Sequence, residues 1–277
     1  MDRRVALRVQ APLVNGLLLA AAALTLFPLF WMVSVSLMSP GEASSYPPPL
    51  VPQRPTLDNY RELFGHAGVG RYLVNSVFLA AAVTAVSLVF NVAAGYAFAK
   101  LRSAGRDRIF KLLLGALVIP GQVAMVPLFL LLKQMGLVNS YGGVIVPAMA
   151  GIFGIFLVRQ YALSIPDDLL DAARIDGASE LHIFRVIVVP IIKPIIVTLA
   201  VFTLLGTWND FMWPLIVLSD QSLYTLPVAL ASLSREHVAD NELMMAGAVV
   251  TTLPVLALFL LLQRHYVQGL MAGSVKA

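Results

Sequence analysis

The residues with the clearest chemical pattern form the polar segment Asp171-Ala-Ala-Arg-Ile-Asp-Gly-Ala-Ser179, which interrupts an otherwise apolar chain. Two carboxylates offer hydrogen-bond acceptors, and small side chains between them would let another surface approach the backbone closely. The carboxylates are those of Asp171 and Asp176, and the small residues are Ala172, Ala173 and Ala178. The pattern predicts recognition of another surface rather than bond-making chemistry. The alternative, a connector that only turns the chain, would need fewer polar residues than this stretch contains.

Local signals around the segment predict two short helices at about residues 166–190. Pro166 and the two aspartates after it are typical of a first helical turn, where acidic groups favour the helix dipole. Gly177 supplies the left-handed position that ends a helix, and Ser179 is a good N-cap for a second helix running toward Pro190. We therefore expect a helix-turn-helix that presents a shaped polar surface.

A second set of polar residues falls inside apolar runs. Asp210 is costly within a membrane, by roughly 2.5 to 3.5 kcal/mol on insertion scales, so it needs an explanation. One interpretation is that Asn209 and Asp210 line a polar passage for a solute rich in hydroxyl groups. The other is a structural acid bonded to a backbone amide near a broken helix. Asn91 is a weaker passage candidate, and an interhelical hydrogen bond is the preferred explanation of this residue.

Most catalytic and metal chemistry has no support in the sequence. The chain has no cysteine, which removes disulfides, thiolate catalysis and cysteine-ligated metals. A nucleotide-binding P-loop requires a glycine directly before its lysine, and no lysine of this chain follows a glycine. No GxSxG elbow is present either. The four histidines show no metal-binding spacing; they are His66, His182, His237 and His265. We expect a subunit that is not an enzyme and carries no cofactor or metal.

Composition identifies the environment in which these residues must be held. The 277 residues are 59% hydrophobic and 12% charged, and an ordinary soluble domain carries about 25% charged residues. Apolar runs long enough to cross about 30 Å of hydrocarbon occur six times. They are approximately residues 12–37, 71–99, 109–132, 142–163, 190–218 and 243–264. We therefore predict an all-α membrane protein with six transmembrane helices, several of them kinked at prolines.

The basic residues predict the orientation of these spans. With six spans, fourteen of the nineteen Lys and Arg residues fall on the side that holds both termini and the Asp171 segment. By the positive-inside rule this side is cytoplasmic. The apolar run at residues 17–37 exceeds a signal-peptide core, so we interpret it as an uncleaved first helix.

These runs suggest three parts of the chain. Residues 1–69 form a first helix and an extracytoplasmic loop, residues 70–265 the main transmembrane domain, and residues 266–277 a cytoplasmic tail. The Pro-rich stretch at residues 39–68 is equally well explained as a spacer or as a contact surface for an external partner. A second long outer loop covers residues 219–242, which are polar enough to face water.

The Asp171–Ser179 segment, followed by Ile183-Phe184 and Val189-Pro190, resembles the EAA loop of permease subunits of bacterial ATP-binding-cassette importers. The resemblance is to the carbohydrate-uptake branch related to the maltose permeases. It extends over nearly the whole chain, including Asn75-Ser76, Ala94-Gly-Tyr-Ala-Phe-Ala-Lys100, Pro127-Leu-Phe129, Leu157-Val-Arg-Gln160, Trp208-Asn-Asp-Phe-Met-Trp-Pro214, Tyr224-Thr-Leu226 and residues 269–277. Asp171 stands where the family usually has Glu, which keeps the carboxylate on a shorter stem.

The resemblance implies a type I importer permease fold in a bacterial inner membrane. It also implies a second, different permease, two ATPase subunits that bind ATP and magnesium, and an external sugar-binding protein, with no nucleic acid. The implied ATPase-coupling residues are Asp171, Ala172, Ala173, Asp176, Gly177, Ala178, Ser179, Phe184 and Pro190. By position, residues 219–242 correspond to a loop that probes the binding protein, and residues 269–277 to a tail near the ATPases.

Two other classes of protein remain as rivals. A stand-alone secondary transporter or channel would be expected to show internal repeats or ion-coupling acids in several spans, and Asp210 is the one such acid found in the predicted spans. An intramembrane enzyme lacks a plausible nucleophile and base.

Overall fold

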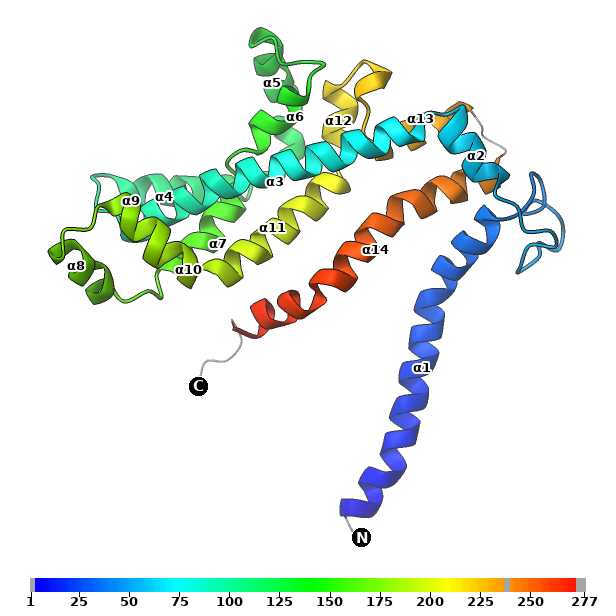
Figure 1. The fold of residues 1–277 in the computed structure, drawn as a ribbon, viewed down its shortest axis with the longest axis horizontal. Helices are drawn as coiled ribbons and strands as arrows, with labels where there is room; N and C mark the ends of the chain where they lie inside the picture. Colours follow the sequence, from blue (N-terminus) through cyan, green and yellow to red (C-terminus); the bar gives the residue numbers. More distant parts are fainter. Residues whose placement is uncertain (1–2, 237–239, 273–277) are drawn as a thin grey trace. The chain divides into compact units, whose positions relative to one another are not determined.

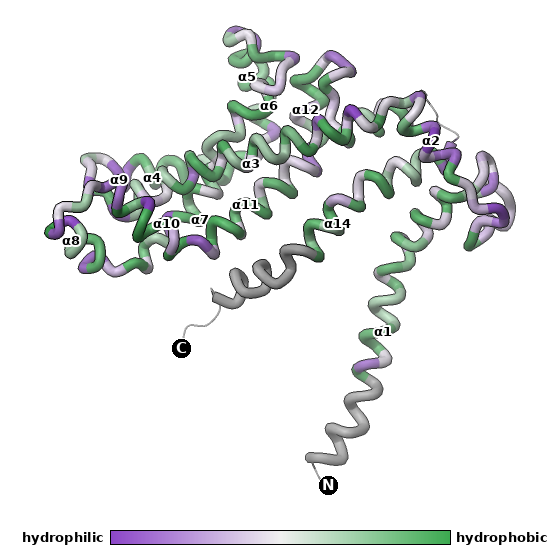
Figure 2. The backbone as a smooth tube through the Cα atoms, viewed as in Figure 1, coloured by the Kyte–Doolittle hydropathy of each residue, from purple (hydrophilic) through white to green (hydrophobic). Residues whose placement is uncertain are grey.

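The computed structural model describes residues 3–236 and 240–272, with side chains for residues 14–234 and 240–260. The described part is helical and contains no strand (Figure 1). Apolar residues run along the long helices, while polar residues gather in the short segments that join them (Figure 2). His237 and residues 273–277 of the expected tail lie outside the described residues. The expectation of an all-α chain is confirmed for the part that the structure describes.

The chain divides into two compact units, which are described separately. One unit comprises Met1–Val69 and Leu230–Pro254, and the other comprises Gly70–Ala229 and Val255–Ala277. The first unit contains α1 (Arg3–Ser36) and α2 (Asp58–Gly65), together with the end of α13 (Leu226–Glu236) and the start of α14 (Asn241–Ala272). A loop of residues 37–57 joins α1 to α2.

The second unit contains the long helix α3 (Val69–Lys100), and α4 (Arg106–Ala116) and α9 (Glu180–Ile183) lie near the Lys100 end of this helix (Figure 1). The unit also holds the start of α13 and the end of α14. Its other helices are α5 (Gly121–Gln134), α6 (Tyr141–Ala148), α7 (Ile152–Ala162), α8 (Asp167–Ile175), the π-helical turn η1 (Phe184–Val188), α10 (Val189–Ile191), α11 (Lys193–Trp208), α12 (Met212–Val217) and the 3-10 turn η2 (Gln221–Leu223).

Helices α3 and α7 approach closely because glycines face the opposite helix. A Cβ atom at Gly95 would lie 2.6 Å from Val158, and one at Gly154 would lie 2.5 Å from Asn91 Nδ2. Small residues at such crossings let helix backbones pack tightly in membranes. The contacts of these two glycines are therefore packing contacts, and they hold α7 beside the end of α3 that contacts the polar segment.

Four helical segments among the described residues are long and apolar enough to cross a membrane: Val14–Ser36, Val69–Lys100, Tyr141–Ala162 and Asn241–Leu260. Two bent helix pairs would bring the number to six if each pair is one span. The chain is therefore a multi-pass membrane protein by the length and composition of its helices.

Two of the expected spans contain a sharp bend between separate helices, where the sequence predicted kinks at prolines. The region 109–132 is broken between α4 and α5, whose axes differ by 107°. Pro120 lies at the break. Proline interrupts a helix because it lacks an N–H and disfavours helical backbone in the residue before it. The region 190–218 is divided among α10, α11 and α12, and the helical run ending at Ile191 meets α11 at 78°.

The expected outer loop of residues 219–242 also contains regular structure. It holds η2 and the eleven residues of α13. Asp220 caps η2 by accepting a hydrogen bond from Ser222 N at 2.8 Å. Within the second unit, the segment is also bonded to α3, since Leu226 N donates to Ser76 Oγ at 2.8 Å. These hydrogen bonds support helical turns in residues 219–242, a region whose polarity predicted a loop.

Candidate coupling site

The turn between α8 and α9 closes with a complete set of backbone hydrogen bonds. Gly177 adopts a left-handed φ of 84°. Ala178 N donates to Ala173 O, and Gly177 N donates to Arg174 O, each at 3.0 Å. This is the Schellman arrangement that satisfies the last carbonyls of a helix. Ser179 then begins the next helix, because its side chain accepts a hydrogen bond from His182 N. Both local predictions at Gly177 and Ser179 are confirmed.

The first helix of this hairpin begins one residue later than the sequence suggested. Pro166 is the N-cap of α8 rather than part of its first turn, with φ −60° and ψ 133°. Proline suits this boundary because its missing N–H would have no partner there in any case. Residues 167–191 are called the hairpin below. They comprise α8, the turn, and a second helical run made of α9, η1 and α10.

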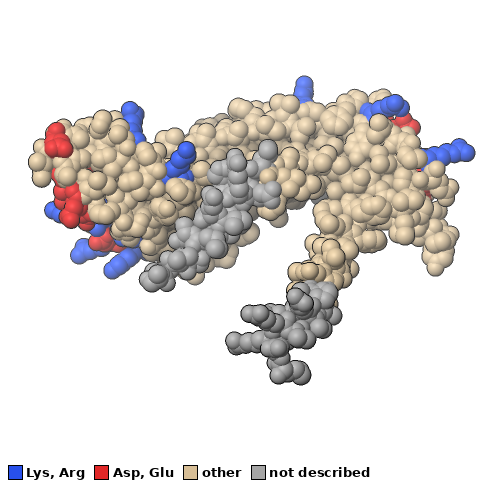
Figure 3. Space-filling model, turned by 60° about the horizontal axis from the view of Figure 1, so that its bottom comes forward, with Lys and Arg blue, Asp and Glu red and all other residues tan. Residues whose placement is uncertain are grey.

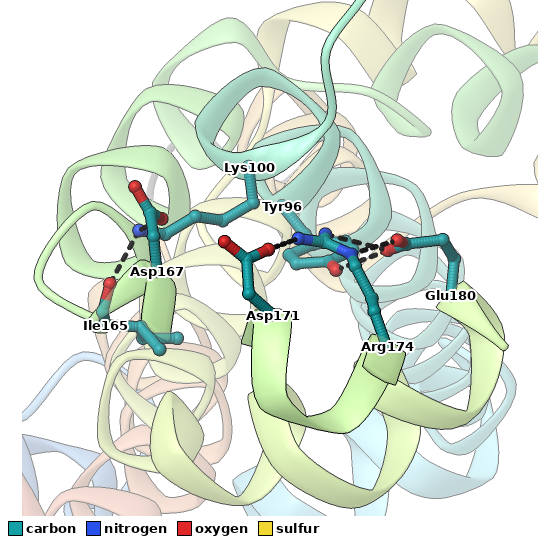
Figure 4. A network of polar contacts seen from close by, with 7 residues as sticks. All are labelled: Tyr96, Lys100, Ile165, Asp167, Asp171, Arg174 and Glu180. Carbon is teal, nitrogen blue, oxygen red and sulfur yellow. Dashed lines mark hydrogen bonds and ion pairs between the residues drawn. The ribbon is translucent and has the colours of Figure 1, made fainter. Parts of the chain in front are cut away.

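Arg174 ties the two helices of the hairpin together. Its Nη1 donates to Asp171 Oδ1 at 2.6 Å, and its Nε donates to Glu180 Oε1 at 2.6 Å (Figure 4). The hydrogen bond to Glu180 has the largest effect on the pKa of the Arg174 guanidinium, and that to Asp171 the next largest; both raise this pKa. A planar guanidinium can hold two carboxylates in one geometry. The turn is therefore braced by charge as well as by backbone bonds.

Tyr96, in the last part of α3, holds the second helix of the hairpin. Its hydroxyl donates to Glu180 Oε2 at 3.0 Å, so Glu180 is shared between Tyr96 and Arg174 (Figure 4). The ring of Tyr96 also packs against Phe184, with ring centroids 5.3 Å apart. Phe184 is half-buried, which places it in the internal packing of the hairpin rather than on its outer surface.

Lys100, the last residue of α3, holds the start of the hairpin. Its ammonium donates to Ile165 O at 2.6 Å and to Asp167 Oδ1 at 2.7 Å. The Lys100 side chain is 6% exposed. Its hydrogen bond to Asp167, and next its charge, lower the pKa of that carboxyl. Lys100 and Tyr96, one turn of helix apart, thus fasten both helices of the hairpin to α3.

An apolar core lies beneath the hairpin. Leu170 and Ile183 are buried with Val158 of α7 and Val92 of α3. Burying a leucine or isoleucine side chain contributes roughly 1.5 to 3 kcal/mol, so each hairpin helix has its own apolar anchor. The hairpin is therefore packed as well as hydrogen-bonded.

The opposite face of the hairpin is open and mixed in character. Ile175 is 85% exposed, and Leu169 and Leu181 are also exposed. Acidic and basic side chains gather at the end of the second unit that carries α8 and α9 (Figure 3). Exposed apolar residues rimmed by polar ones are typical of protein interaction sites. This face could seat a partner protein.

The structure distributes the expected coupling residues over both faces. Four of them are exposed on the hairpin and its turn: Ala172, Asp176, Gly177 and Ser179. Asp171 is exposed but bonded to Arg174, while Ala173 and Ala178 pack against the core. Pro190 is exposed within α10.

Four residues of the site were not among the expected coupling residues: Tyr96, Lys100, Arg174 and Glu180. Arg174 and Glu180 lie within the hairpin itself, and residues three apart on a helix, such as Asp171 and Arg174, are neighbours on its surface. Tyr96 and Lys100 contact residues 84 and 67 positions away along the chain. Their partners are brought to them by the packing of α3 against the hairpin, which no local pattern encodes.

The three passage candidates are not brought together. Asp210 lines a cavity of about 240 Å³ in the second unit, with Thr207 and Trp213 among its neighbours. Asp210 also accepts a hydrogen bond from Trp213 N at 3.3 Å, so both interpretations of this acid have support. Asn209 is exposed and donates to Leu205 O at the end of α11.

Asn91 is 1% exposed and faces the close contact of α3 with α7. Its Nδ2 donates to Ser87 Oγ at 2.7 Å, within the same helix. The bond expected to cross between helices therefore stays within α3. Asn91 Oδ1 has no hydrogen-bond partner.

Comparison with known proteins identifies the family. Residues 91–271 match the family described as the inner membrane component of binding-protein-dependent transport systems. The chain belongs to this family. The match covers the hairpin, α7 and most of the second unit, so the segment singled out by its polarity lies within the matched region.

Relatives of this permease cover nearly all of its length. It is 37% identical over 276 residues to the arabinooligosaccharides transport system permease protein AraQ of Halalkalibacterium halodurans, covering 97% of this chain and 99% of that protein. It is 35% identical to the lactose transport system permease protein LacG of Rhizobium radiobacter, covering 92% and 93%. The sn-glycerol-3-phosphate permease UgpE of Yersinia pestis is 31% identical, again covering 92% and 93%.

The fold also matches a solved structure. A chain of a bacterial ABC transporter involved in the import of the acidic polysaccharide alginate aligns with a TM-score of 0.82 at 22% identity. The alignment covers 95% of this permease and 98% of that chain. The permease therefore has the fold of an ABC importer subunit, and the family assignment replaces the stand-alone transporter as an explanation of the sequence.

Proposed function

We propose that this chain is one permease subunit of a carbohydrate importer in a bacterial inner membrane, driven by a separate ATPase that docks on the hairpin. The observation that carries the proposal is the hairpin itself. A turn braced by Arg174, fastened to α3 by Tyr96 and Lys100, presents exposed residues outward. Such a surface can receive force from a partner and pass it to a membrane helix.

The proposed topology has six spans with both termini in the cytoplasm. It is supported by the four long apolar helices and the two bent pairs, and by the excess of basic residues on the side of the hairpin. In this arrangement the domain bounds expected from the sequence, near residues 69 and 265, separate the first helix and the tail from the main transmembrane part.

The proposed complex contains a second, different permease, two ATPase subunits and an external binding protein. Membership in a binding-protein-dependent family supports the last two partners. ATP and magnesium are assigned to the ATPases, and no cofactor or metal to this chain. This assignment is supported by the lysine contexts of the sequence, because no lysine follows a glycine.

The proposed cargo is a mono- or oligosaccharide, or a related polyol or sugar phosphate. The names of relatives at 31 to 37% identity refer to arabinooligosaccharides, lactose and glycerol phosphate. Within this chain, the cavity beside Asp210 combines polar Thr207 and Asp210 with the ring of Trp213. Carboxylate and hydroxyl groups can bind sugar hydroxyls, and an aromatic ring can pack on a sugar face.

The coupling step follows from the attachments of the hairpin. Closure of the ATPases displaces α8 and α9, and the displacement passes to α3 through Tyr96, Lys100 and the shared core. Because α3 also contacts α7 closely at Gly95 and Gly154, the two helices move together. The permease thereby alternates between inward-facing and outward-facing states.

The test is reconstitution of the chain in liposomes, alone and with its candidate partners, followed by labelled-sugar uptake with and without ATP. We expect uptake only with the complete set and ATP. Uptake by this chain alone, driven by an ion gradient, would show that it is a stand-alone transporter.

A second test removes the turn while preserving the rest of the chain. Gly177→Val places a β-branched residue at a left-handed position, which costs about 1 to 2 kcal/mol. The matched control is Gly136→Val, since Gly136 also has a positive φ and open space around it. We expect loss of ATPase pull-down with the first variant and normal pull-down with the control. Normal pull-down by both variants would argue against docking at the hairpin.

A further inference from the structure

The loop that joins α1 to α2, residues 37–57, is held firmly although it contains no regular helix. Glu42 accepts hydrogen bonds from Ser39 N at 3.0 Å and from Gln53 N at 2.6 Å. Glu242 at the start of α14 is fully buried and accepts a hydrogen bond from Ala43 N at 2.8 Å. Hydrogen bonds from backbone N–H groups to carboxylates are strong, so the two acids fix the backbone of the loop.

Side chains at both ends of the loop complete its support. Asn59 of α2 is buried and donates to Ser36 O and Met38 O, at 3.0 and 2.9 Å. Thr56 N donates to Leu37 O at 2.9 Å. A slack spacer would leave these groups to water. The loop is instead preorganised, which indicates that the surface it presents matters.

The presented surface is apolar and uncharged. Tyr46 is 99% exposed, and Leu50 and Val51 are each 59% exposed. The eight residues 46–53 include no charged side chain, and the one acid of the loop, Glu42, bonds to backbone N–H groups of the loop itself. Rigid exposure of a tyrosine and two aliphatic residues is unfavourable in water, at about 25 cal/mol per Å² of apolar surface. Covering these side chains with an apolar environment would therefore be favourable.

The loop folds back to the level of the last turn of α1. Ser34 Oγ donates to Leu50 O at 2.7 Å, and Ser34 precedes the end of α1 by two residues, which is about 3 Å along the helix axis. Phe30 and Val33 on the same helix are exposed, and the most apolar window of the segment Val14–Ser36 has no residue buried inside the protein. The loop therefore continues the apolar surface of α1.

We propose that Tyr46, Leu50 and Val51 insert into the interfacial layer of the bilayer beside the end of α1, so that the loop is a lipid anchor. The proposal rests on the proposed function only in that α1 spans the membrane. Tyrosine is typical of the boundary between headgroups and hydrocarbon, and aliphatic side chains strengthen such binding. A protein partner is disfavoured because the tip offers it no charge and lies at membrane level.

The absence of cysteine in this chain gives a direct test. A nitroxide spin label is attached to single-cysteine variants of the complete transporter in liposomes, with cysteines in the partner subunits replaced. The variants are Leu50→Cys and Val51→Cys, with Arg54→Cys as an exposed control on the same loop and Leu24→Cys as a control within α1. Collisions with oxygen, which concentrates in hydrocarbon, are compared with collisions with a water-soluble nickel chelate.

We expect the oxygen-to-nickel collision ratio at positions 50 and 51 to be severalfold higher than at position 54 and lower than at position 24, with or without the binding protein. A ratio at 50 and 51 equal to that at 54 would overturn the anchor. So would protection that appears only when the binding protein is added, because it would indicate a protein contact. A high ratio at position 24 with normal ATP-driven uptake would then leave the proposed function standing.

Discussion

The two ends of α3 hold neighbouring segments by different chemistry. Near its start, Asn75 Nδ2 donates to Ser222 O and Tyr224 O, and Asn75 Oδ1 accepts from the hydroxyl of Tyr141 at 2.8 Å. This attachment is neutral and Asn75 is buried. Near its other end, Lys100 and Tyr96 reach the hairpin through bonds to exposed carboxylates.

The difference indicates different mechanical demands on the two ends. A buried neutral network has fixed geometry and is costly to break, because its groups would be left unpaired. At the other end the acceptors are exposed, since the Asp167 and Glu180 side chains are 75% and 48% exposed although that of Lys100 is only 6% exposed. Water can therefore replace the partners that these carboxylates lose when the contact rearranges. In the proposed importer, α3 is held firmly at the end that bears Asn75 and adjustably at the end where ATP-driven movement enters.

Asn75→Ala should have the largest effect, because it breaks the buried network. Two backbone carbonyls and one tyrosine hydroxyl lose their partner, and each unpaired buried group costs about 1 to 3 kcal/mol. We expect a lower Tm of the purified complex, followed by fluorescence or light scattering. Asn209→Ala is the control, since Asn209 is exposed and bonds only within its own helix end. An equal Tm shift in both variants would remove the distinction between the two ends.

Tyr96→Phe should have the next largest effect, on coupling rather than on stability. The variant loses the bond to Glu180 and keeps the ring that packs on Phe184. We expect less sugar imported per ATP hydrolysed, with normal pull-down of the ATPase. The control is Tyr161→Phe, which removes a hydroxyl on α7 outside this network. Unchanged coupling in the Tyr96 variant would show that its hydroxyl transmits nothing.

Lys100→Met should reduce coupling by a similar or smaller amount, and equally at pH 6 and pH 8. The pKa of Asp167 lies below its usual value because of Lys100. The stabilisation from this pair is therefore present above the ordinary carboxyl pKa and is lost only as the pH falls through the lowered one. Uptake per ATP measured at both pH values checks this, with Lys111→Met on α4 as control. A deficit that changes between pH 6 and 8 would implicate another titrating group.

Salt should have the smallest effect, confined to the hairpin. The side chain of Arg174 is 35% exposed and those of its two partners 56% and 48%, and the Debye length falls to about 3 Å at 1 M salt. We expect a modest drop in coupling at high salt that is absent in Arg174→Gln, whose pairs are already lost. The Tm shift caused by Asn75→Ala should not depend on salt. A salt-dependent shift there would contradict the neutral character of that end.

Sequence patterns predicted the local features well. The left-handed Gly177, the cap at Ser179 and the apolar runs each depend on neighbouring residues, so spacing alone identified them. Kinks at prolines were expected, but the size of the 107° bend at Pro120 was not, because apolar content does not distinguish a slightly kinked span from a sharply bent one. The helix α13 was missed because the polarity of residues 219–242 indicates exposure to water and not a backbone conformation. Lys100 and Tyr96 were missed as site residues because their partners meet them only through tertiary packing.

The central claim, that an ATPase docks on the hairpin, is tested most directly by photocrosslinking in the complete transporter. A photoreactive amino acid replaces Ile175, the most exposed apolar residue of α8, and in a control it replaces Met135 at the end of α5, which is also exposed. The account predicts a crosslink to the ATPase subunit from position 175, altered in yield by ATP, and none from position 135. Normal ATP-driven uptake without a crosslink from position 175 would contradict it.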